Sequence, residues 1–458
     1  MTTRVLVPSG VLGLGFDADA LARGVAARPD VIAIDGGSTD SGPAYLGAGT
    51  SKYADSTIRA EWRALLAARR EAGVPLVIGS AGTCGTDSQV DRMVALTDEL
   101  AREAGETLRV ATVRSEQRVD ALLKACDAGR VRPLAGGALD ADDEPLRSRV
   151  ERCTHVVALA GAEPIAAALA TGADVVVAGR CTDTALISAL PLARGERAGA
   201  AWHAAKIAEC GALCSTRPTT GTVMVEIDAG GFTVRAFGRG ARCTPYTVSA
   251  HMLYENSDPF VLHEPGGRLD VTDAAYADAG DGAVRVTGSV WVPDEAYTLK
   301  LEGARVAGHQ VTSLVLVRDP RYVRRIDEWC ETLAARLDGL ARAQAGGGDH
   351  RIELRRIGVD ATLGTLEPAR GAPVEVGVLL LVTAATPELA LDVARLANPH
   401  LLHHPLPGDE SLPSFAFPYS PAETVRGPVH EFCLDHVLRV DSPTDGTRLD
   451  TLVVGAGA

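Results

Sequence analysis

The sequence lacks several features that mark membrane-bound and secreted proteins. Its 458 residues contain no run of about 18 apolar residues, which a membrane-spanning helix needs. Residues 1–14 have neither the basic start nor the continuous apolar core of a signal peptide. The nine cysteines are scattered, odd in number and without a CxxC pair, so they fit reduced thiols better than disulfides or structural zinc. These absences predict a cytoplasmic protein.

Excess basic charge and nucleotide-binding motifs are also missing. The formal net charge of −14 is spread along the chain, which argues against nucleic acid or an anionic membrane as a partner. No glycine-rich loop has the Gly-Lys-Ser/Thr ending of a triphosphate site, and no GxGxxG follows the first expected strand. We therefore expect no nucleotide cofactor, and an anionic substrate would need local positive groups.

Length and composition indicate a globular protein with more than one domain. Hydrophobic residues make up 46% of the chain and charged residues 23%, which allows a large buried core. A chain of 458 residues exceeds what one core normally organises. We expect an α/β domain over residues 1–215, built as a parallel sheet of βαβ units, and then an α+β domain over residues 216–458 with a largely antiparallel sheet.

The expected βαβ units follow from short apolar runs that alternate with helical stretches. The predicted strands cover residues 4–10, 30–37, 75–82, 108–113, 154–161 and 174–180. The predicted helices cover residues 18–28, 59–72, 89–104, 116–128 and 164–171. From about residue 221 the segments alternate as antiparallel strands do, with an amphipathic helix over residues 322–340. Because ligands bind at the carboxyl ends of parallel strands, the loops after these strands are the expected location of a site.

The loop IDGGSTDSGP, residues 34–43, concentrates polar groups directly after an apolar strand. Its carboxylates, Asp35 and Asp40, have the chemistry for acid–base catalysis or metal binding. The groups that would cradle a carboxylate or phosphate include Gly37, Ser38 and Ser41. The alternative is an Asx-type turn that only caps the next helix.

A second loop, SAGTCGTDSQ over residues 80–89, also lies between a strand and a helix. The helix N-terminus there would attract an anion. The residues that we place in the site are Ser80, Gly82, Thr83 and Asp87. Alternatively, Asp87 only caps the helix.

A third loop, AGRCTDTA over residues 178–185, supplies Arg180 and Asp183. Arg180 would hold a substrate carboxylate through two parallel hydrogen bonds, or it would pair with Asp183 and stiffen the loop. Carboxylates at different strand ends often converge, so the pattern leaves open a divalent metal between Asp35, Asp40 and Asp183.

Later segments add further candidate groups. In HAAKIAECGA, Cys210 would be a nucleophile with Glu209 as its base, although a lone cysteine is more often an inert small hydrophobe. His251 is either a substrate ligand or a core histidine. Lys300 lies between two leucines on a predicted strand, where it would meet an anionic ligand or form a salt bridge.

Taken in order, these segments resemble the acyclic terpene utilisation (AtuA-like) family. The resemblance runs from VLVPSGVLGLGF through AIDGGSTDSGPAYLGAG, PLVIGSAGTCGTDSQ, VVVAGRCTDTA, KIAECGA, RCTPYTVSAHMLYENSDPF and YTLKLEGA to HEFCLDHVLRVDSP. Long members of the family carry a further small C-terminal domain, whereas this chain stops soon after HVLRVDSP. The resemblance therefore implies a separately encoded companion subunit of roughly a hundred residues and an oligomeric assembly.

The residues themselves favour proton transfer beside a carbonyl. Carboxylates, hydroxyls and cations at strand ends fit proton abstraction next to a carboxylate or thioester, followed by loss, addition or migration of water. We expect the large subunit of a hydratase, dehydratase or isomerase acting on a small hydroxy acid or hydroxyacyl-CoA.

In this hypothesis Asp35 or Asp40 moves the proton. Arg180 and residues 80–83 hold the acid or thioester, and Lys300 stabilises developing negative charge. The alternatives are a lyase or hydrolase that uses Cys210 to cleave a carbon–carbon or thioester bond, and a non-catalytic subunit that binds acyl-CoA or a small acid.

Overall fold

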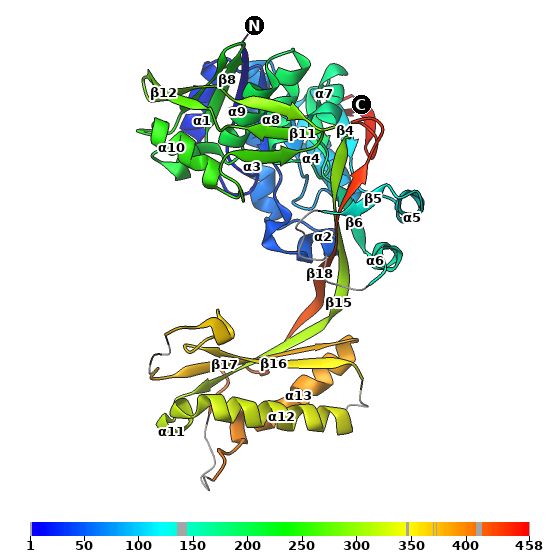
Figure 1. Cartoon of the computed structure of the whole chain (residues 1–458), viewed down its shortest axis with the longest axis vertical. Helices are drawn as coiled ribbons and strands as arrows, with labels where there is room; N and C mark the ends of the chain where they lie inside the picture. The colour runs from blue at the N-terminus through cyan, green and yellow to red at the C-terminus, as the bar shows by residue number, and fades with distance from the viewer. Residues whose placement is uncertain are drawn as a thin grey trace. The chain divides into compact units, whose positions relative to one another are not determined.

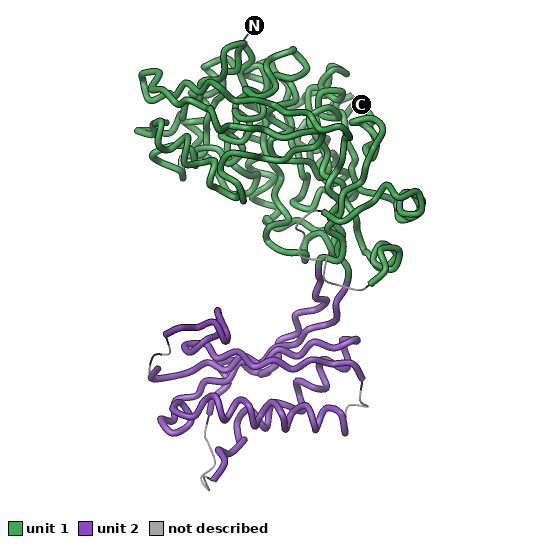
Figure 2. The backbone as a smooth tube through the Cα atoms, viewed as in Figure 1, with its two compact units in different colours: residues 1–305, 432–458 green, residues 306–431 purple. Residues whose placement is uncertain are grey.

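The computed structural model describes residues 2–134, 144–344, 348–369, 371, 373–408 and 415–457. This part of the chain forms two compact units, which Figure 2 shows in different colours. Unit 1 comprises residues 1–305 and 432–458, and unit 2 comprises residues 306–431. The chain leaves unit 1 within strand β15 (Thr298–Val317) and returns within strand β18 (Glu423–Arg439).

This division differs from the expected boundary between residues 215 and 216. The segment after residue 221 does form antiparallel strands, but they join the N-terminal sheet through the pairing of β8 (Val223–Asp228) with β1 (Thr3–Val7). Without β8, strand β1 would expose a row of unpaired backbone groups at the edge of the parallel strands. The antiparallel strands therefore extend the first sheet, and the second unit begins much later in the chain.

The main sheet of unit 1 has ten strands among the described residues, in the order β12-β13-β9-β8-β1-β2-β3-β7-β4-β19. The parallel strands are β1, β2 (Val31–Asp35), β3 (Leu76–Gly79), β7 (Val175–Ala178) and β4 (Thr107–Arg114). The antiparallel strands are β8, β9 (Gly231–Ala236), β13 (Ala283–Thr287), β12 (Ala275–Gly280) and β19 (Arg448–Gly455). The predicted mixed α/β fold, with parallel βαβ units and antiparallel strands, is confirmed.

Helices cover both faces of this sheet (Figure 1). One face carries α1 (Ala18–Ala26), α3 (Asp55–Ala72) and α4 (Asp87–Ala104), and the other carries α7 (Ala162–Ala170), α8 (Asp183–Ala193) and α9 (Ala198–Ala208). Strand β2 needs helices on both faces of the sheet, because all five of its residues are buried and the first four are apolar. Ile32 and Ile34 pack toward the first group of helices, and Val31 and Ala33 pack toward the second.

One predicted parallel strand takes a different place. Residues 154–161 contain β6 (His155–Ala158), which pairs antiparallel with the first part of β15 and not with the main sheet. Strands β4 and β7 pair directly with each other, so the sheet has no gap between them for β6. Near it, β18 pairs with β5 (Val131–Pro133).

Short elements complete unit 1. The strands β10 (Val261–Glu264), β11 (Gly267–Asp270) and β14 (Val290–Pro293) form a small antiparallel sheet. The remaining helices are α2 (Ala44–Ala48), α5 (Val119–Asp127), α6 (Leu146–Arg152), α10 (Pro245–Ala250) and the 3-10 turns η1 (Thr39–Ser41), η2 (Gly211–Cys214), η3 (Pro218–Thr220) and η4 (His251–Leu253).

Unit 2 is an antiparallel sheet with helices packed on one face (Figure 1). Its strands are β16 (His350–Ile357), β17 (Val376–Ala384), the later part of β15 and the first part of β18, in that order. Its helices are α11 (Pro320–Arg324), α12 (Ile326–Gln344) and α13 (Pro387–His403), with η5 (Gly364–Leu366). Alternate β17 residues such as Val378 and Leu380 pack with Trp329 and Leu333 of α12, so this unit has its own apolar core.

The single helix predicted over residues 322–340 is divided between α11 and α12, which are separated at Arg325. None of the helices in the described ranges combines the length and apolar character that crossing a membrane requires.

Candidate functional site

A cavity of about 490 Å³ lies where the carboxyl ends of three parallel strands meet in unit 1. Ser9 follows β1, Asp35 is the last residue of β2, Gly37 lies two residues later, and Asp183 follows β7. All four residues line this cavity. The polar loops therefore converge at the edge of the sheet where parallel α/β proteins bind ligands.

A second cavity of about 450 Å³ adjoins the first, because Ser38, Asp40, Asp183 and Glu255 line both. Its wall brings together the charged residues Arg180, Lys206, Glu209, Glu264, Lys300 and Glu302. We call the two cavities together the strand-end site.

Asp35 is a buried carboxyl group at the end of β2, and its residue is only 6% exposed. The backbone N–H of Gly37 donates to Oδ2 at 2.8 Å, whereas Oδ1 has no hydrogen-bond partner among the described residues. Burial, and then the negative charge of Asp183, raise the pKa of Asp35 well above its ordinary value. Burial therefore favours the protonated form of Asp35, and the residue lines the first cavity.

Glycines allow the loops around Asp35 to approach so closely. Gly37 has φ of +127°, and a Cβ there would lie 2.9 Å from the Cα of Thr83. At the end of β3, a Cβ on Gly79 would lie 2.5 Å from the Sγ of Cys181. Side chains at either position would separate the loops after β2, β3 and β7.

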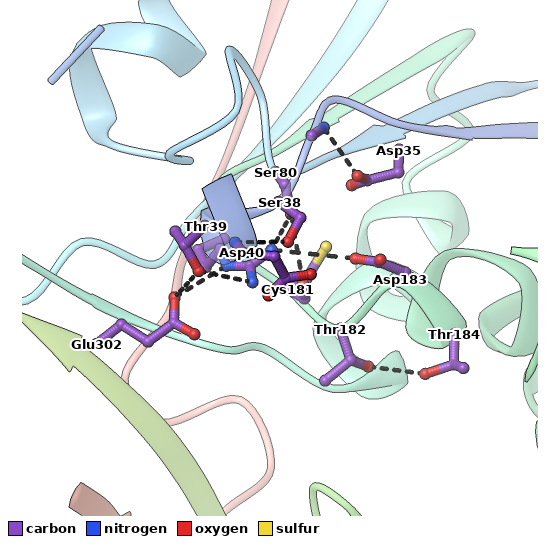
Figure 3. A network of polar contacts seen from close by, with 12 residues as sticks. Asp35, Ser38, Thr39, Asp40, Ser80, Cys181, Thr182, Asp183, Thr184 and Glu302 are labelled. Atoms are coloured by element: carbon purple, nitrogen blue, oxygen red, sulfur yellow. Dashed lines mark hydrogen bonds and ion pairs between the residues drawn. The ribbon is translucent and has the colours of Figure 1, made fainter. Parts of the chain in front are cut away.

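Arg180 is held by protein groups. Its guanidinium donates to Glu302 at 3.2 Å, to the Ser80 hydroxyl at 3.0 Å and to the Thr39 hydroxyl at 3.3 Å. Thr39 itself donates to Glu302 at 2.9 Å (Figure 3). Burial alone would raise the pKa of Glu302, but the charges of Arg180 and Lys300 lower it. These contacts favour a structural role for Arg180 over the expected grip on a substrate carboxylate.

Asp183 lies 4.0 Å from an Nη atom of Arg180, and one third of its side-chain surface remains exposed, at the cavity wall. Burial raises the pKa of Asp183 to about 6; Arg180 opposes this shift and Asp40 adds to it. Asp183 is thus mostly ionised at neutral pH, and its negative charge favours the protonated form of Asp35, as in sites that pair a base with an acid.

Two further carboxyl groups line the second cavity. Glu209 accepts a hydrogen bond of 2.5 Å from Lys206, and burial raises the pKa of Glu209 to about 8 despite that cation. Glu264 accepts a hydrogen bond of 2.5 Å from Thr184, and burial raises the pKa of Glu264 to about 7. Lys300 is the more exposed cation, with 41% of its side chain accessible and its Nζ 3.4 Å from Glu302.

The expected pairing of Cys210 with Glu209 has a different character in the structure. Glu209 is engaged with Lys206, and Cys210 follows α9 at the wall of the first cavity. Burial, and then the charge of Glu209, raise the pKa of the Cys210 thiol. A thiol whose ionisation is disfavoured is a poor nucleophile.

His251 is 5% exposed and stacks on Tyr254 with ring centroids 5.5 Å apart. Burial lowers the pKa of His251 to about 4. Among the described residues, Glu209, Cys210 and His251 are the one group of three whose ligand atoms lie within 4.8 Å of one another. Asp35, Asp40 and Asp183 do not form such a group within the part of the chain that the structure describes.

The loop after β3 does not line either cavity. Ser80 and Thr83 are completely buried, and Gly82 packs against Gln89. Asp87 lies at the first turn of α4 and pairs with Arg448. Of the loop residues that we expected in the site, two contact its residues from behind the wall. Ser80 accepts a hydrogen bond from Arg180, and the Thr83 hydroxyl accepts one from the N–H of Lys52, which lines the first cavity. Ser41 and Ser38, from the loop after β2, do line the first cavity.

Some residues of the site were not expected from the sequence. Glu302 lies two positions after Lys300 on β15, and this strand spacing places both side chains on one face. The available signal was a second charged residue among the apolar residues of the LKLEGA segment, at strand spacing from Lys300. Glu264 ends β10 in a separate small sheet, and its sequence surroundings give no comparable signal.

The fold and the strand-end site define a mixed α/β protein with carboxyl-lined cavities at the ends of its parallel strands. Residues 44–414 match the model of the acyclic terpene utilisation family, described as acyclic terpene utilisation family protein AtuA. This range exceeds half of the 458 residues, and the chain belongs to that family. No curated protein and no solved structure matches the chain significantly. Asp35 precedes the matched range, whereas Asp183 and Lys300 lie within it.

Proposed function

We propose that this chain is the large subunit of a hydro-lyase or isomerase that acts on a small hydroxy acid or hydroxyacyl thioester. The observation that carries the proposal is the buried carboxyl group of Asp35, whose Oδ1 has no partner among the described residues and which shares a cavity with Asp183. Two carboxyl groups with separated pKa values supply an acid and a base in one site.

In the dehydration direction, Asp183 accepts the proton from the carbon next to the carbonyl. The electrons of that C–H bond form the new double bond, and the C–O bond of the neighbouring hydroxyl breaks. Protonated Asp35 donates its proton to the departing hydroxyl, which leaves as water. Isomerisation needs the same two groups but returns the proton to a different carbon.

Lys300 supplies the positive charge for the anionic end of the substrate. Its ammonium group is accessible in the second cavity, while Arg180 and Lys206 are buried in ion pairs with Glu302 and Glu209. Lys300 therefore replaces Arg180 in our assignment of the carboxylate-binding role. The raised pKa of Cys210 gives no support to a thiol nucleophile, so we do not propose the cysteine-dependent alternative.

We also propose that the active assembly contains a small companion subunit, on the basis of the family resemblance. The test is to co-express the chain with a neighbouring reading frame of roughly a hundred residues and to purify the complex. Hydroxy acids and hydroxyacyl thioesters are then screened by ultraviolet absorbance for formation of the conjugated enoate.

The expected result is absorbance growth that disappears in Asp35→Asn and declines in the wild type below about pH 6, where Asp183 becomes protonated. A stable complex that binds these compounds without turning any of them over would instead support a binding subunit. Product formation that survives unchanged in both Asp35→Asn and Asp183→Asn would contradict the assigned acid and base.

A further inference from the structure

Glu209, Cys210 and His251 form a cluster beside the proposed acid and base. The first two residues follow α9, and His251 begins the 3-10 turn η4. A carboxylate oxygen, the thiol sulfur and an imidazole nitrogen of these residues lie within 4.8 Å of one another. The proposed reaction gives none of the three a role.

His251 provides a second, independent observation. Only 5% of the residue's surface is exposed, and its Nε2 makes no hydrogen bond to the described residues. Buried polar atoms of native proteins are nearly always partnered, so an unpartnered nitrogen on an imidazole ring that lies beside a thiol and a carboxylate calls for a ligand. Stacking on Tyr254 restrains the orientation of the ring.

The surroundings leave a carboxylate oxygen of Glu209 outside its contact with Lys206 and place two of the three residues at cavity walls. Lys206 contacts Oε1 of Glu209, and that contact does not use the second carboxylate oxygen. Cys210 lines the first cavity and Glu209 lines the second, so the cluster is accessible from the strand-end site. Three protein ligands with a further position open to a cavity is the arrangement of catalytic zinc sites.

We infer that Glu209, Cys210 and His251 bind a divalent transition-metal ion of the zinc class. The donor set selects this class: thiolate and imidazole favour zinc, cobalt or nickel, whereas magnesium and calcium prefer oxygen ligands alone. Binding displaces the thiol proton of Cys210 and any proton on the Glu209 carboxyl group, and the displaced protons are released to solvent. The site extends beyond the proposed function, because neither Asp35 nor Asp183 contributes a ligand.

The test uses the full chain, stripped of metal with a chelator and titrated with Zn²⁺ in competition with a chromophoric chelator, and separately with Co²⁺. We expect one high-affinity ion per chain, release of about one to two protons per ion and a sulfur-to-cobalt charge-transfer band in the near ultraviolet. The band is read on the wild-type protein, so it does not depend on a variant that folds poorly.

Cys210→Ser and His251→Gln should each weaken Zn²⁺ binding by roughly tenfold or more, since even the outer partners of metal ligands cost that much. Cys126→Ser is the matched control, because Cys126 is a free and similarly half-buried thiol, and it should leave the affinity unchanged. Asp35→Asn should also bind Zn²⁺ normally, which separates this inference from the proposed reaction.

Absence of the charge-transfer band in wild type, or equal affinity in wild type and Cys210→Ser, would overturn the inference. Loss of binding in the Cys126→Ser control would do so as well, because it would place the ion elsewhere.

Discussion

The loops after β2 and β3 look alike in sequence and differ in the structure. Each follows a short apolar strand, is rich in glycine and hydroxyl groups, and contains an aspartate close to a helix. The end of β2 and the loop after it place Asp35, Ser38 and Asp40 on the cavity wall. The loop after β3 is buried, with Ser80 and Thr83 at zero exposure.

The position of β3 in the sheet explains the difference. Strand β3 lies between β2 and β7, so its loop is enclosed by the loops that follow its neighbours. The N–H of Thr83 donates to the carbonyl of Gly36 at 3.0 Å, and the N–H of Arg180 donates to the carbonyl of Gly85 at 3.2 Å. The loop after β3 thus acts as a spacer that holds its neighbours, and the comparison teaches that composition alone does not identify a ligand loop.

The largest expected difference between the two loops is in catalysis. Asp35→Asn should lower the turnover number by about 10²–10⁴, because it removes the acid of the proposed reaction. Asp87→Asn, in the other loop, should change the rate by no more than a few fold, since Asp87 pairs with Arg448 and lines neither cavity. The measurement is steady-state enoate formation by both variants. Equal losses would mean that the two loops do not differ in function.

The free energy of unfolding should be sensitive to substitutions in the closely packed loop after β3. Gly85 has φ of +64°, and a Cβ there would lie 2.6 Å from the Cα of Arg180, so Gly85→Ala should cost about 2–5 kcal/mol through backbone strain and overpacking. Gly73 has nearly the same φ of +68° with open space around it, so Gly73→Ala should cost only about 1–2 kcal/mol. Urea denaturation gives both free energies of unfolding, and similar values would show that the loop after β3 is not closely packed.

The stability of the folded protein should depend on pH through a carboxyl group of the cavity wall, Glu264. Glu264 keeps its proton up to about pH 7 in the folded protein, compared with an ordinary pKa of 4.5. Between these values the folded state binds more protons than the unfolded state, so this group's contribution to stability is lost as the pH rises. Glu264→Gln does not titrate, and it should gain roughly 1–3 kcal/mol on wild type between about pH 4.5 and 8.

Unfolding free energies at both ends of that range, for wild type and variant, provide the measurement. Glu151→Gln is the control for removing a carboxylate at an exposed position, because the Glu151 side chain is half exposed on α6. If the stability of Glu264→Gln relative to wild type fell as the pH rises, the result would contradict the raised pKa of Glu264.

The smallest expected effect concerns substrate charge. Lys300→Met should raise KM for an anionic substrate by about tenfold, because one charge-assisted contact is lost, and the difference should shrink at high salt. Lys124→Met, which removes an exposed lysine on α5, should leave KM unchanged. A drop in the turnover number with constant KM would instead assign Lys300 to the transition state.

Much of the fold could be predicted from local pattern. The apolar runs that became β2 and β7, and the amphipathic segments that became α3 and α4, were expected close to their observed bounds. Their periodicity reflects burial on one or both faces, which each segment carries in its own residues. The pairing of β6 with β15 was not expected, because strand partners are set by long-range contacts that a local pattern does not contain.

The site divides in the same way. The sequence by itself determined that Asp35, Asp183 and Lys300 follow or occupy apolar strands, and that the chain belongs with the acyclic terpene utilisation family. Only the tertiary structure decided that Arg180 is held by Glu302 and that the loop after β3 is buried. The reason is physical: a side chain's chemistry is local, but its burial, charge partners and pKa depend on which distant strands lie beside it.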